Sequence, residues 1–127
     1  MTVHRSIPLA VLVPFVALAG CAIDRPTQAN LAEYCSPHNA YLLGSQARVY
    51  LGVCPKETEA QFLQGLAHGR AMRPSTPVVE PYYQQIAQTE QRLLVASSEA
   101  EREPLRARLR DLEWWAIHLL NTQDAMN

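Results

Sequence analysis

The chain has 127 residues, a formal net charge of −1, 48% hydrophobic residues and 18% charged residues. This length allows one small domain, and the composition is that of a globular protein rather than a disordered one. The near-neutral charge gives no indication of nucleic-acid binding, which needs clustered basic residues. A core this small gains from a covalent cross-link, so the cysteines are of particular interest.

The first twenty residues have the character of a bacterial export signal. A weakly positive start precedes an apolar run over residues 7–19. The run is too short for a membrane-spanning helix, which needs about 20 residues, and suits a signal-peptide core. It ends in Leu18-Ala19-Gly20-Cys21, which resembles a bacterial lipobox. We therefore expect residues 1–20 to be a lipoprotein signal peptide and Cys21 to be the lipidation site.

Lipidation of this kind places a diacylglycerol on the cysteine sulfur and usually a further acyl chain, such as palmitate, on the new N-terminus. Two or more chains give stable membrane anchoring. Residue 22 is Ala rather than the aspartate of an inner-membrane retention signal, so the resemblance implies the outer membrane, facing the periplasm. Residues 21–33 are mostly polar and are predicted to form a lipidated tether. A partly ordered lead-in to the core remains the alternative.

If Cys21 carries lipid, Cys35 and Cys54 remain, and an oxidising periplasm favours a disulfide between them. A loop of about 20 residues closed in this way contributes roughly 3 kcal/mol by chain-entropy reasoning. A metal site that adds His38 and His68 is an alternative, but zinc ligands usually come in tighter pairs. A redox-active pair would need closer spacing. We therefore predict the disulfide, with no metal and no cofactor.

Residues 34–73 are predicted to form a small disulfide-closed helical module. Ser36-Pro37 is a typical helix start, because serine caps free N–H groups and proline suits the first helical position. Gly44 is the expected stop, since glycine tolerates the left-handed conformation that closes a helix. An irregular connection over residues 45–53 then ends in a turn.

A second helix is expected after Pro55. Its apolar side consists of Phe62, Leu63 and Leu66. Gly65 and Gly69 lie four residues apart on one face, although glycine in a helix interior costs about 0.8–1 kcal/mol relative to alanine. Their position indicates a close approach between two helix backbones.

These residues also carry a resemblance to a known family. The arrangement Tyr34-Cys-x-Pro-x-Asn, Gly44, Tyr50-x-Gly-Val-Cys-Pro and Phe62-x-x-Gly-x-x-x-Gly-Arg resembles the domain of unknown function 2799. That family comprises small proteobacterial envelope proteins, commonly predicted lipoproteins. Members often carry a further segment with glycine and tryptophan upstream of the Tyr-Cys, so this chain resembles a short version. The resemblance implies an envelope location but does not imply any particular activity.

The rest of the chain is predicted to be a Pro-rich linker, residues 74–81, and an antiparallel helical hairpin, residues 82–123. Ser98 and Glu101 fit a capping box for the last helix, which starts between Glu99 and Pro104. Apolar stripes at helical spacing run through Tyr82, Ile86, Thr89, Leu93 and Ala96, and through Leu105, Leu109, Leu112, Ala116 and Leu119. A coiled-coil dimer through the second stripe is the alternative.

Charged residues crowd the first turns of the last helix. Three glutamates lie near its start, and arginines follow them, which suits the helix dipole and short-range ion pairs. We interpret this run as a solvated face; its members are Glu99, Glu101, Arg102, Glu103, Arg106, Arg108 and Arg110.

The segment from Trp114 to Leu120 is apolar almost all round the helix. Such a segment is normally buried, so we expect it to pack against the hairpin partner and the disulfide module. The alternative is a contact surface for a partner protein, for a second copy, or for the lipid interface, where tryptophan is common.

Motifs of known chemistry are scarce in this chain. It has no glycine-rich phosphate loop, no Gly-x-Ser-x-Gly and no pair of histidines at ligand spacing. His38, His68 and His118 are widely separated and are expected at the surface or at helix caps. The carboxylates of the last helix alternate with arginines, which keeps them ionised and unsuited to general-acid work. The chain is therefore predicted not to be an enzyme.

We expect an all-α lipoprotein, anchored in the outer membrane and facing the periplasm, with a non-catalytic structural or protein-binding role. Its partner would be an envelope protein or a second copy. A small-ligand or metal-binding envelope module is the alternative, and a weak hydrolase would need a cleft that the pattern does not reveal. The candidate partner contacts are Tyr82, Tyr83, Trp114 and Trp115, or the tyrosines of the disulfide loop, Tyr41 and Tyr50.

Overall fold

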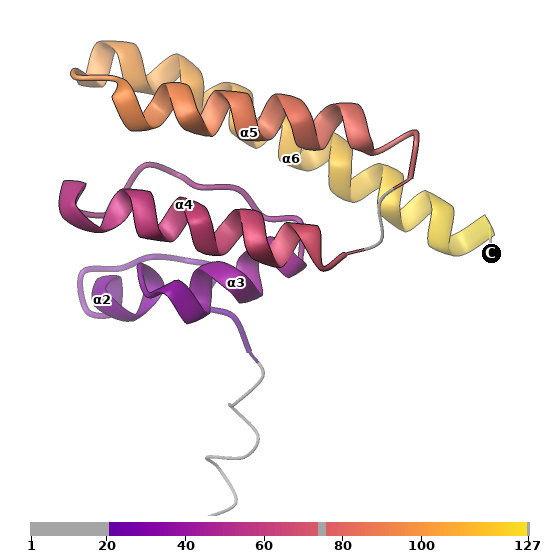
Figure 1. The fold of residues 1–127 in the computed structure, drawn as a ribbon, viewed down its shortest axis with the longest axis horizontal. Helices are drawn as coiled ribbons and strands as arrows, with labels where there is room; N and C mark the ends of the chain where they lie inside the picture. Colours follow the sequence, from indigo (N-terminus) through magenta and orange to yellow (C-terminus); the bar gives the residue numbers. More distant parts are fainter. Residues whose placement is uncertain (1–20, 74–75, 127) are drawn as a thin grey trace, which may run out of the picture.

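The computed structural model describes residues 21–73 and 76–126, and the regular structure within these ranges is entirely helical. The all-α fold is therefore confirmed, while the predicted signal peptide, residues 1–20, lies outside the described residues. Figure 1 shows two layers, with α2, α3 and α4 in one and a hairpin of α5 and α6 in the other. The helices are α2 (Leu31–Tyr34), α3 (Pro37–Ser45), α4 (Lys56–Ala71), α5 (Glu80–Val95) and α6 (Glu99–Met126).

Helix α3 begins where the sequence predicts and ends one residue later. The Ser36 hydroxyl accepts a hydrogen bond from the Asn39 N–H at 3.2 Å, and Pro37 is the first helical residue. The predicted stop at Gly44 is wrong, because the helix continues to Ser45 and the left-handed residue beyond it is Ala47, at φ 64°. Gly44 instead lies at the contact between α3 and α4.

The glycines of α3 and α4 allow the two helix backbones to touch. A Cβ atom on Gly69 would lie 2.0 Å from the Tyr41 carbonyl oxygen, and one on Gly44 would lie 2.2 Å from the Leu66 carbonyl oxygen. Real side chains do not approach backbone atoms this closely, so only glycine fits at these positions. The close approach that the glycine spacing in α4 predicts is confirmed.

The predicted disulfide is present and closes the part of the module that contains α3 and the connection to α4. Cys35, at the end of α2, is bonded to Cys54, just before α4, and their Cα atoms lie 5.8 Å apart. Beside the bond, the Phe62 ring packs against the rings of Tyr34 and Tyr50 at centroid distances of 5.5 and 5.2 Å. Because both sulfur atoms form this bond, neither is a thiolate that could bind the metal in the alternative site with His38 and His68.

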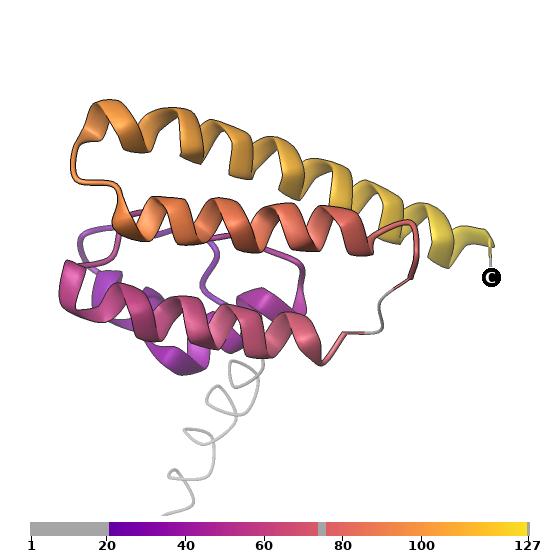
Figure 2. The same ribbon diagram turned by 45° about the horizontal axis from the view of Figure 1, so that its top comes forward.

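Helices α5 and α6 form the predicted antiparallel hairpin (Figure 2). Ile86 and Leu93 of α5 are fully buried, as are Leu109 and Ala116 of α6. The apolar stripe of α6, for which a coiled-coil dimer was the alternative, is thus buried within the chain itself. Helix α5 begins two residues earlier than expected because Pro81 is accommodated in its first turn, where no N–H is needed.

Helix α6 begins at Glu99, the earliest start that the sequence allowed. The Ser98 hydroxyl accepts a hydrogen bond from the Glu101 N–H at 3.2 Å, which confirms the predicted cap. Hydrogen bonds from the Ser97 and Ser98 hydroxyls to the Glu101 carboxylate lower the pKa of that carboxyl. Pro104 lies inside the helix, near its start.

The connection between α3 and α4 runs between the two layers (Figure 1). The layers themselves touch directly at few points, whereas α3 packs along α4 and α5 along α6. Charged side chains of the hairpin reach the backbone of this connection: the Glu113 carboxylate accepts from the Val49 N–H at 2.9 Å and that of Glu90 from the Tyr50 N–H at 3.1 Å. The backbone N–H groups of this irregular connection, which no helix or sheet pairs, thus find hydrogen-bond acceptors in these carboxylates.

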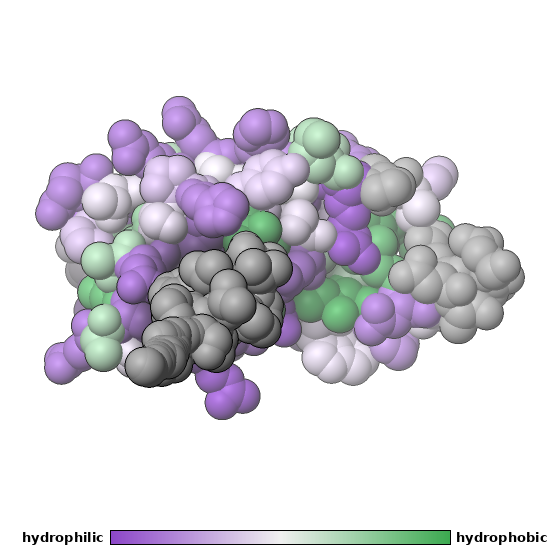
Figure 3. Space-filling model, turned by 90° about the horizontal axis from the view of Figure 1, so that it is seen from below, coloured by the Kyte–Doolittle hydropathy of each residue, from purple (hydrophilic) through white to green (hydrophobic). Residues whose placement is uncertain are grey.

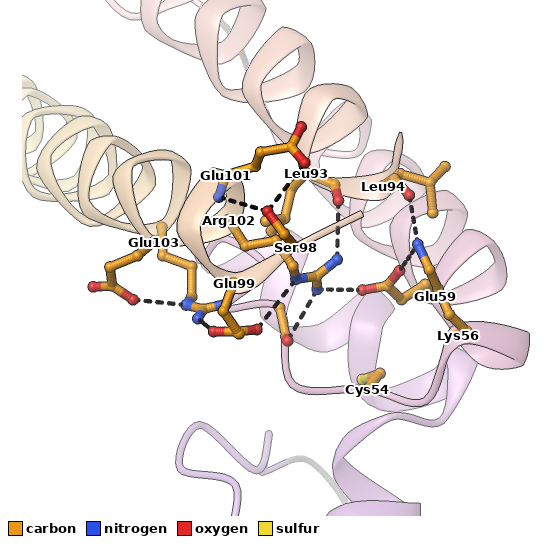
Figure 4. A network of polar contacts seen from close by, with 12 residues as sticks. Cys54, Lys56, Glu59, Leu93, Leu94, Ser98, Glu99, Glu101, Arg102 and Glu103 are labelled. Atoms are coloured by element: carbon orange, nitrogen blue, oxygen red, sulfur yellow. Dashed lines mark hydrogen bonds and ion pairs between the residues drawn. The ribbon is translucent and has the colours of Figure 1, made fainter. Parts of the chain in front are cut away.

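Glu59 is the centre of the first of two buried ionic groups (Figure 4). Its carboxylate accepts from the Tyr50 hydroxyl at 2.5 Å and from the Arg102 guanidinium at 2.7 Å. Arg102 also donates to the Leu93 and Gly52 carbonyls, each at 3.1 Å. One guanidinium thus connects α6 with α4, with the end of α5 and with the interlayer connection.

The burial of Arg102 corrects the prediction that this charged run is a solvated face throughout. Only 9% of Arg102 is exposed, and 1% of Glu59. Arg102 precedes Leu109 by two helical turns and therefore lies on the same, buried side of α6. Arg108 and Arg110 remain at the surface.

Arg70 and Glu90 form the second buried group. The Arg70 guanidinium lies 3.2 Å from the Glu90 carboxylate and also donates to the Arg48 carbonyl at 3.4 Å. Burial raises the pKa of Glu90, and the charge of Arg70 and the Tyr50 N–H oppose that rise. This pair connects α4, α5 and the same connection between the layers.

Replacing Arg102 tests whether its buried contacts hold the layers together. Arg102→Met would leave the Glu59 carboxylate with the Tyr50 hydroxyl and the exposed Lys56 as its remaining partners. Breaking a buried ion pair from one side typically costs about 3–5 kcal/mol, and we expect the free energy of unfolding in urea to fall by about that amount.

The matched control is Arg110→Met, which removes an exposed arginine from the same helix and should change stability by about 0.5 kcal/mol or less. Adding Glu59→Gln to Arg102→Met should recover part of the loss, since it removes the stranded charge. Equal losses in the two arginine variants, or no recovery in the double variant, would contradict the assigned role.

Candidate functional site

The chain just after Cys21 is held against α3 by hydrogen bonds. The Ile23 N–H donates to the Asn39 side-chain oxygen at 2.7 Å, and the Asn39 amide donates to the Ile23 carbonyl at 3.0 Å. Asn39 is buried and also donates to the Tyr34 carbonyl at 2.9 Å, so its side chain is held in place where it binds Ile23. Cys21 itself is exposed and has a free thiol. A group attached to its sulfur would lie beside α3.

The remainder of the predicted tether is also partly folded. The Asn30 side chain accepts from the Thr27 N–H at 2.6 Å and donates to the Arg25 carbonyl at 3.1 Å, which closes a turn just before α2. Ala22 and Ile23 pack against the hydrophobic core. The structure therefore favours the partly ordered lead-in that the sequence left open over a free tether.

The two tryptophans form an exposed aromatic cluster with His118 on α6. Trp114 is 57% exposed and Trp115 is 42% exposed, so the prediction that they pack inside the fold is wrong. Their ring centroids are 4.9 Å apart in an edge-on arrangement, and the Trp114 ring is stacked on the His118 ring at 5.0 Å. We refer to Trp114, Trp115 and His118 as the tryptophan cluster.

Helix geometry explains why the tryptophan cluster points outward. Leu112 and Ala116 are buried against α5, and Glu113 faces the connection between the layers. A side chain two residues after a buried one is rotated by about 200° around the helix, which carries Trp114 to the opposite side. The rest of the fold covers α6 from one side only, so a segment that is apolar all round the helix cannot be buried all round.

The two tyrosines predicted to share a surface with the tryptophans do not lie with them. Tyr83 of α5 is buried, and only 7% of it is exposed. Tyr82 is half-buried and packs against the core. The four aromatic residues therefore do not form one contact surface, and the exposed part of the predicted patch is the tryptophan pair.

The tyrosines of the disulfide loop also differ in their roles. Tyr50 is fully buried, so its prediction as a surface contact is wrong; its hydroxyl accepts from the Cys54 N–H and donates to Glu59. Burial first, and then the hydrogen bond to Glu59, raises the pKa of Tyr50 and keeps its phenol neutral. Tyr41 is half-buried, with its ring edge-on to His68 at 5.3 Å.

His38, His68 and His118 are all exposed, as predicted. Within the described ranges, no three histidine, cysteine or acidic residues come close enough to one another to hold a metal ion. None of the helices in this part of the chain combines the length and the hydrophobicity that a membrane span requires.

The face beside the start of the described chain is largely polar. Figure 3 views the molecule from this side and shows hydrophilic residues over most of the described surface, with a hydrophobic area toward the end where α6 finishes. The described part of this face is therefore not a continuous hydrophobic surface.

Residues 27–71 match the model of a family described as a protein of unknown function, DUF2799. This is the family that the cysteine and glycine pattern resembles, so the predicted resemblance is confirmed over this segment. It runs from just before α2 to the last residue of α4, so the α5–α6 hairpin lies outside the match. The comparisons with curated proteins and with solved structures found no match.

Proposed function

We propose that this protein, with its DUF2799 segment at residues 27–71, is a lipid-anchored outer-membrane protein that binds another envelope protein without catalysing a reaction. The observation that carries the proposal is the position of Cys21. Its thiol is free and exposed, and the residues that follow it at once are fixed to the fold. An apolar run and lipobox precede it in the sequence.

The short connection to Cys21 limits how the protein would sit on a membrane. Because Ile23 is bonded to Asn39 of α3, lipid on Cys21 would keep the α2–α3 side close to the bilayer. The α5–α6 hairpin lies on the other side of the molecule (Figures 1 and 2). This arrangement supports a protein partner, rather than the lipid interface, for the tryptophan cluster on α6.

The small size of the tryptophan cluster means that a binding partner must supply most of the interface. Exposed tryptophans surrounded by polar residues are typical of the small set of side chains that dominate binding energy at an interface. Arg110, Asp111 and Asn121 are exposed near the cluster and provide such surroundings. Stable interfaces bury about 1,200–2,000 Å² in total, which three rings cannot supply alone, so the partner must contribute a pocket for them.

The buried ionisable groups support a structural role for the polar interior. Glu59, Arg102, Arg70 and Glu90 are paired with one another across the layers. The alternative of a metal-binding module loses its thiolate ligands, because Cys35 and Cys54 are joined. The proposal therefore assigns no catalytic residue.

Replacing Cys21 tests the anchor. We expect the chain produced in bacteria to be found in the outer-membrane fraction, with an intact mass that begins at Cys21 and includes attached lipid. Cys21→Ser should abolish both the lipid mass and the membrane association, because serine offers no sulfur for the attachment. Mass spectrometry of the fractionated protein measures both.

The double variant Cys35→Ser/Cys54→Ser serves as the control, since it removes the other two sulfurs and should retain the lipid. In the unchanged protein, two further thiols should react with an alkylating reagent only after reduction. A wild-type chain without lipid, or a Cys21→Ser chain that still fractionates with the membrane, would exclude the anchor.

Replacing the tryptophans tests the partner. Trp114→Ala and Trp115→Ala should each change the free energy of unfolding by about 0.5 kcal/mol or less, because both side chains are exposed. Each should weaken a crosslink between this protein and a different envelope protein in intact membranes, as detected by mass spectrometry.

Val95→Ala removes an exposed apolar side chain at the far end of α5 and should leave the crosslink unchanged. Crosslinks that are the same in all variants would refute a role for the tryptophans in binding. A crosslink only between two copies of the chain would replace the heterologous partner with self-association. Loss of folding in the tryptophan variants would mean that the rings serve the fold.

A further inference from the structure

A groove of about 400 Å³ lies between the end of α4 and the start of α5. Three alanines, Ala67, Ala71 and Ala87, are among the residues that line it, so part of its wall is apolar and consists of small side chains. Arg70 and Tyr83 also line the groove. The other lining residues, Arg73, Glu80 and Gln84, are also polar or charged, so the groove combines a small apolar wall with a polar one.

Two buried hydrogen-bond donors of this groove have no partner among the described residues. They are the Tyr83 hydroxyl and the Arg70 Nε–H, and both residues are more than nine-tenths buried. Arg70 uses its two other nitrogens for Glu90 and the Arg48 carbonyl, which fixes the guanidinium in place. A buried donor without an acceptor costs about 1–3 kcal/mol, so a ligand that supplies acceptors would gain from both groups. Because both atoms are covered in this structure, the ligand must displace the side chains that cover them.

The charges around the Tyr83 hydroxyl indicate what kind of acceptor suits the groove. Burial raises the pKa of Tyr83, while the nearby charges of Arg73 and Arg70 lower it and that of Glu80 raises it. The phenol therefore keeps its proton and acts as a donor at neutral pH. The charge of Arg70 is already paired with Glu90, and Arg73 and Glu80 oppose each other. The surroundings therefore have no excess positive charge for a group with two negative charges, such as a phosphate dianion, whereas two hydrogen-bond donors suit a single carboxylate.

The start of α5 does not add donors to this set. The N–H groups of Tyr82 and Tyr83 donate to the Val79 carbonyl, and that of Glu80 donates to the Thr76 carbonyl. Pro81 has no N–H. Recognition at the groove thus depends on side chains and not on a helix terminus.

We propose that this groove binds a ligand through a single carboxylate, which accepts hydrogen bonds from the Tyr83 hydroxyl and from the Arg70 Nε–H. The two carboxylate oxygens match the two donors in number, and the alanine walls leave room for a small adjoining group. The carboxylate belongs either to a small organic acid or to the C-terminus of a peptide. The groove shares no lining residue with the surroundings of Cys21 or with the tryptophan cluster, and the proposal does not depend on the proposed anchor.

Titrations followed by nuclear magnetic resonance test the proposal. Sodium acetate, trialanine with a free C-terminus and trialanine amide are added separately to the disulfide-bonded protein, with sodium chloride at equal ionic strength as the reference. We expect saturable shifts of the Arg70 Nε–H and Tyr83 ring signals with the free carboxylates and none with the amide. Tighter binding of trialanine than of acetate identifies a peptide terminus as the source, and the reverse identifies a small acid.

Matched variants connect the response to the groove. Tyr83→Phe removes only the hydroxyl and should weaken binding by about tenfold, which corresponds to about 1.4 kcal/mol. Ala87→Leu, at an exposed helical position, should fill the groove and abolish binding without unfolding the protein. Tyr82→Phe, which changes the neighbouring tyrosine outside the groove lining, should bind as the wild type does.

The proposal is overturned if neither acetate nor trialanine gives shifts beyond those of chloride. It is equally overturned if trialanine amide binds as well as trialanine, since recognition would then not need the carboxylate. Unchanged affinity in both Tyr83→Phe and Ala87→Leu would place any binding elsewhere on the protein.

Discussion

The buried Glu59 carboxylate is the group on which the joining of the two layers depends. It receives the Tyr50 hydroxyl from the connection between α3 and α4 and the Arg102 guanidinium from α6. A charge removed from water is tolerated only when hydrogen bonds replace its hydration, and here those bonds come from both layers. The Arg70–Glu90 pair repeats the arrangement at another point of the same connection. The irregular segment is thus held in place by ionic groups from three helices.

Much of the fold follows from local sequence signals. The Ser36 cap, the glycines of α4 and the leucine stripe of α6 each act through their immediate neighbours, and the structure has all three. The buried charges could not be predicted in the same way, because Glu59 and Arg102 resemble ordinary surface residues of their helices. They become buried only because the connection returns between the layers. The spacing of Arg102 from Leu109 is the one sequence signal that places it on the core side.

The candidate site was harder to predict than the fold, for a related reason. Trp114 and Trp115 lie in an apolar segment, but only one side of α6 has a neighbouring layer, so they remain exposed. Tyr50 and Tyr83 were expected at the surface, yet both are buried by contacts between distant segments. The proposed function depends on how these features are arranged. The two layers form one body, which carries Cys21 on one side. The hairpin on the other side carries the tryptophan cluster.

Hydrogen exchange of the Val49 and Tyr50 amides tests the account most directly. Both N–H groups donate to carboxylates of the hairpin, Glu113 and Glu90. If the ionic contacts join the layers, these amides should exchange as slowly as the core amides of α4, through global unfolding only, despite their position in an irregular segment. Exchange at a much lower opening free energy than that of the α4 core would show that the connection opens independently, and would contradict the central role of these contacts.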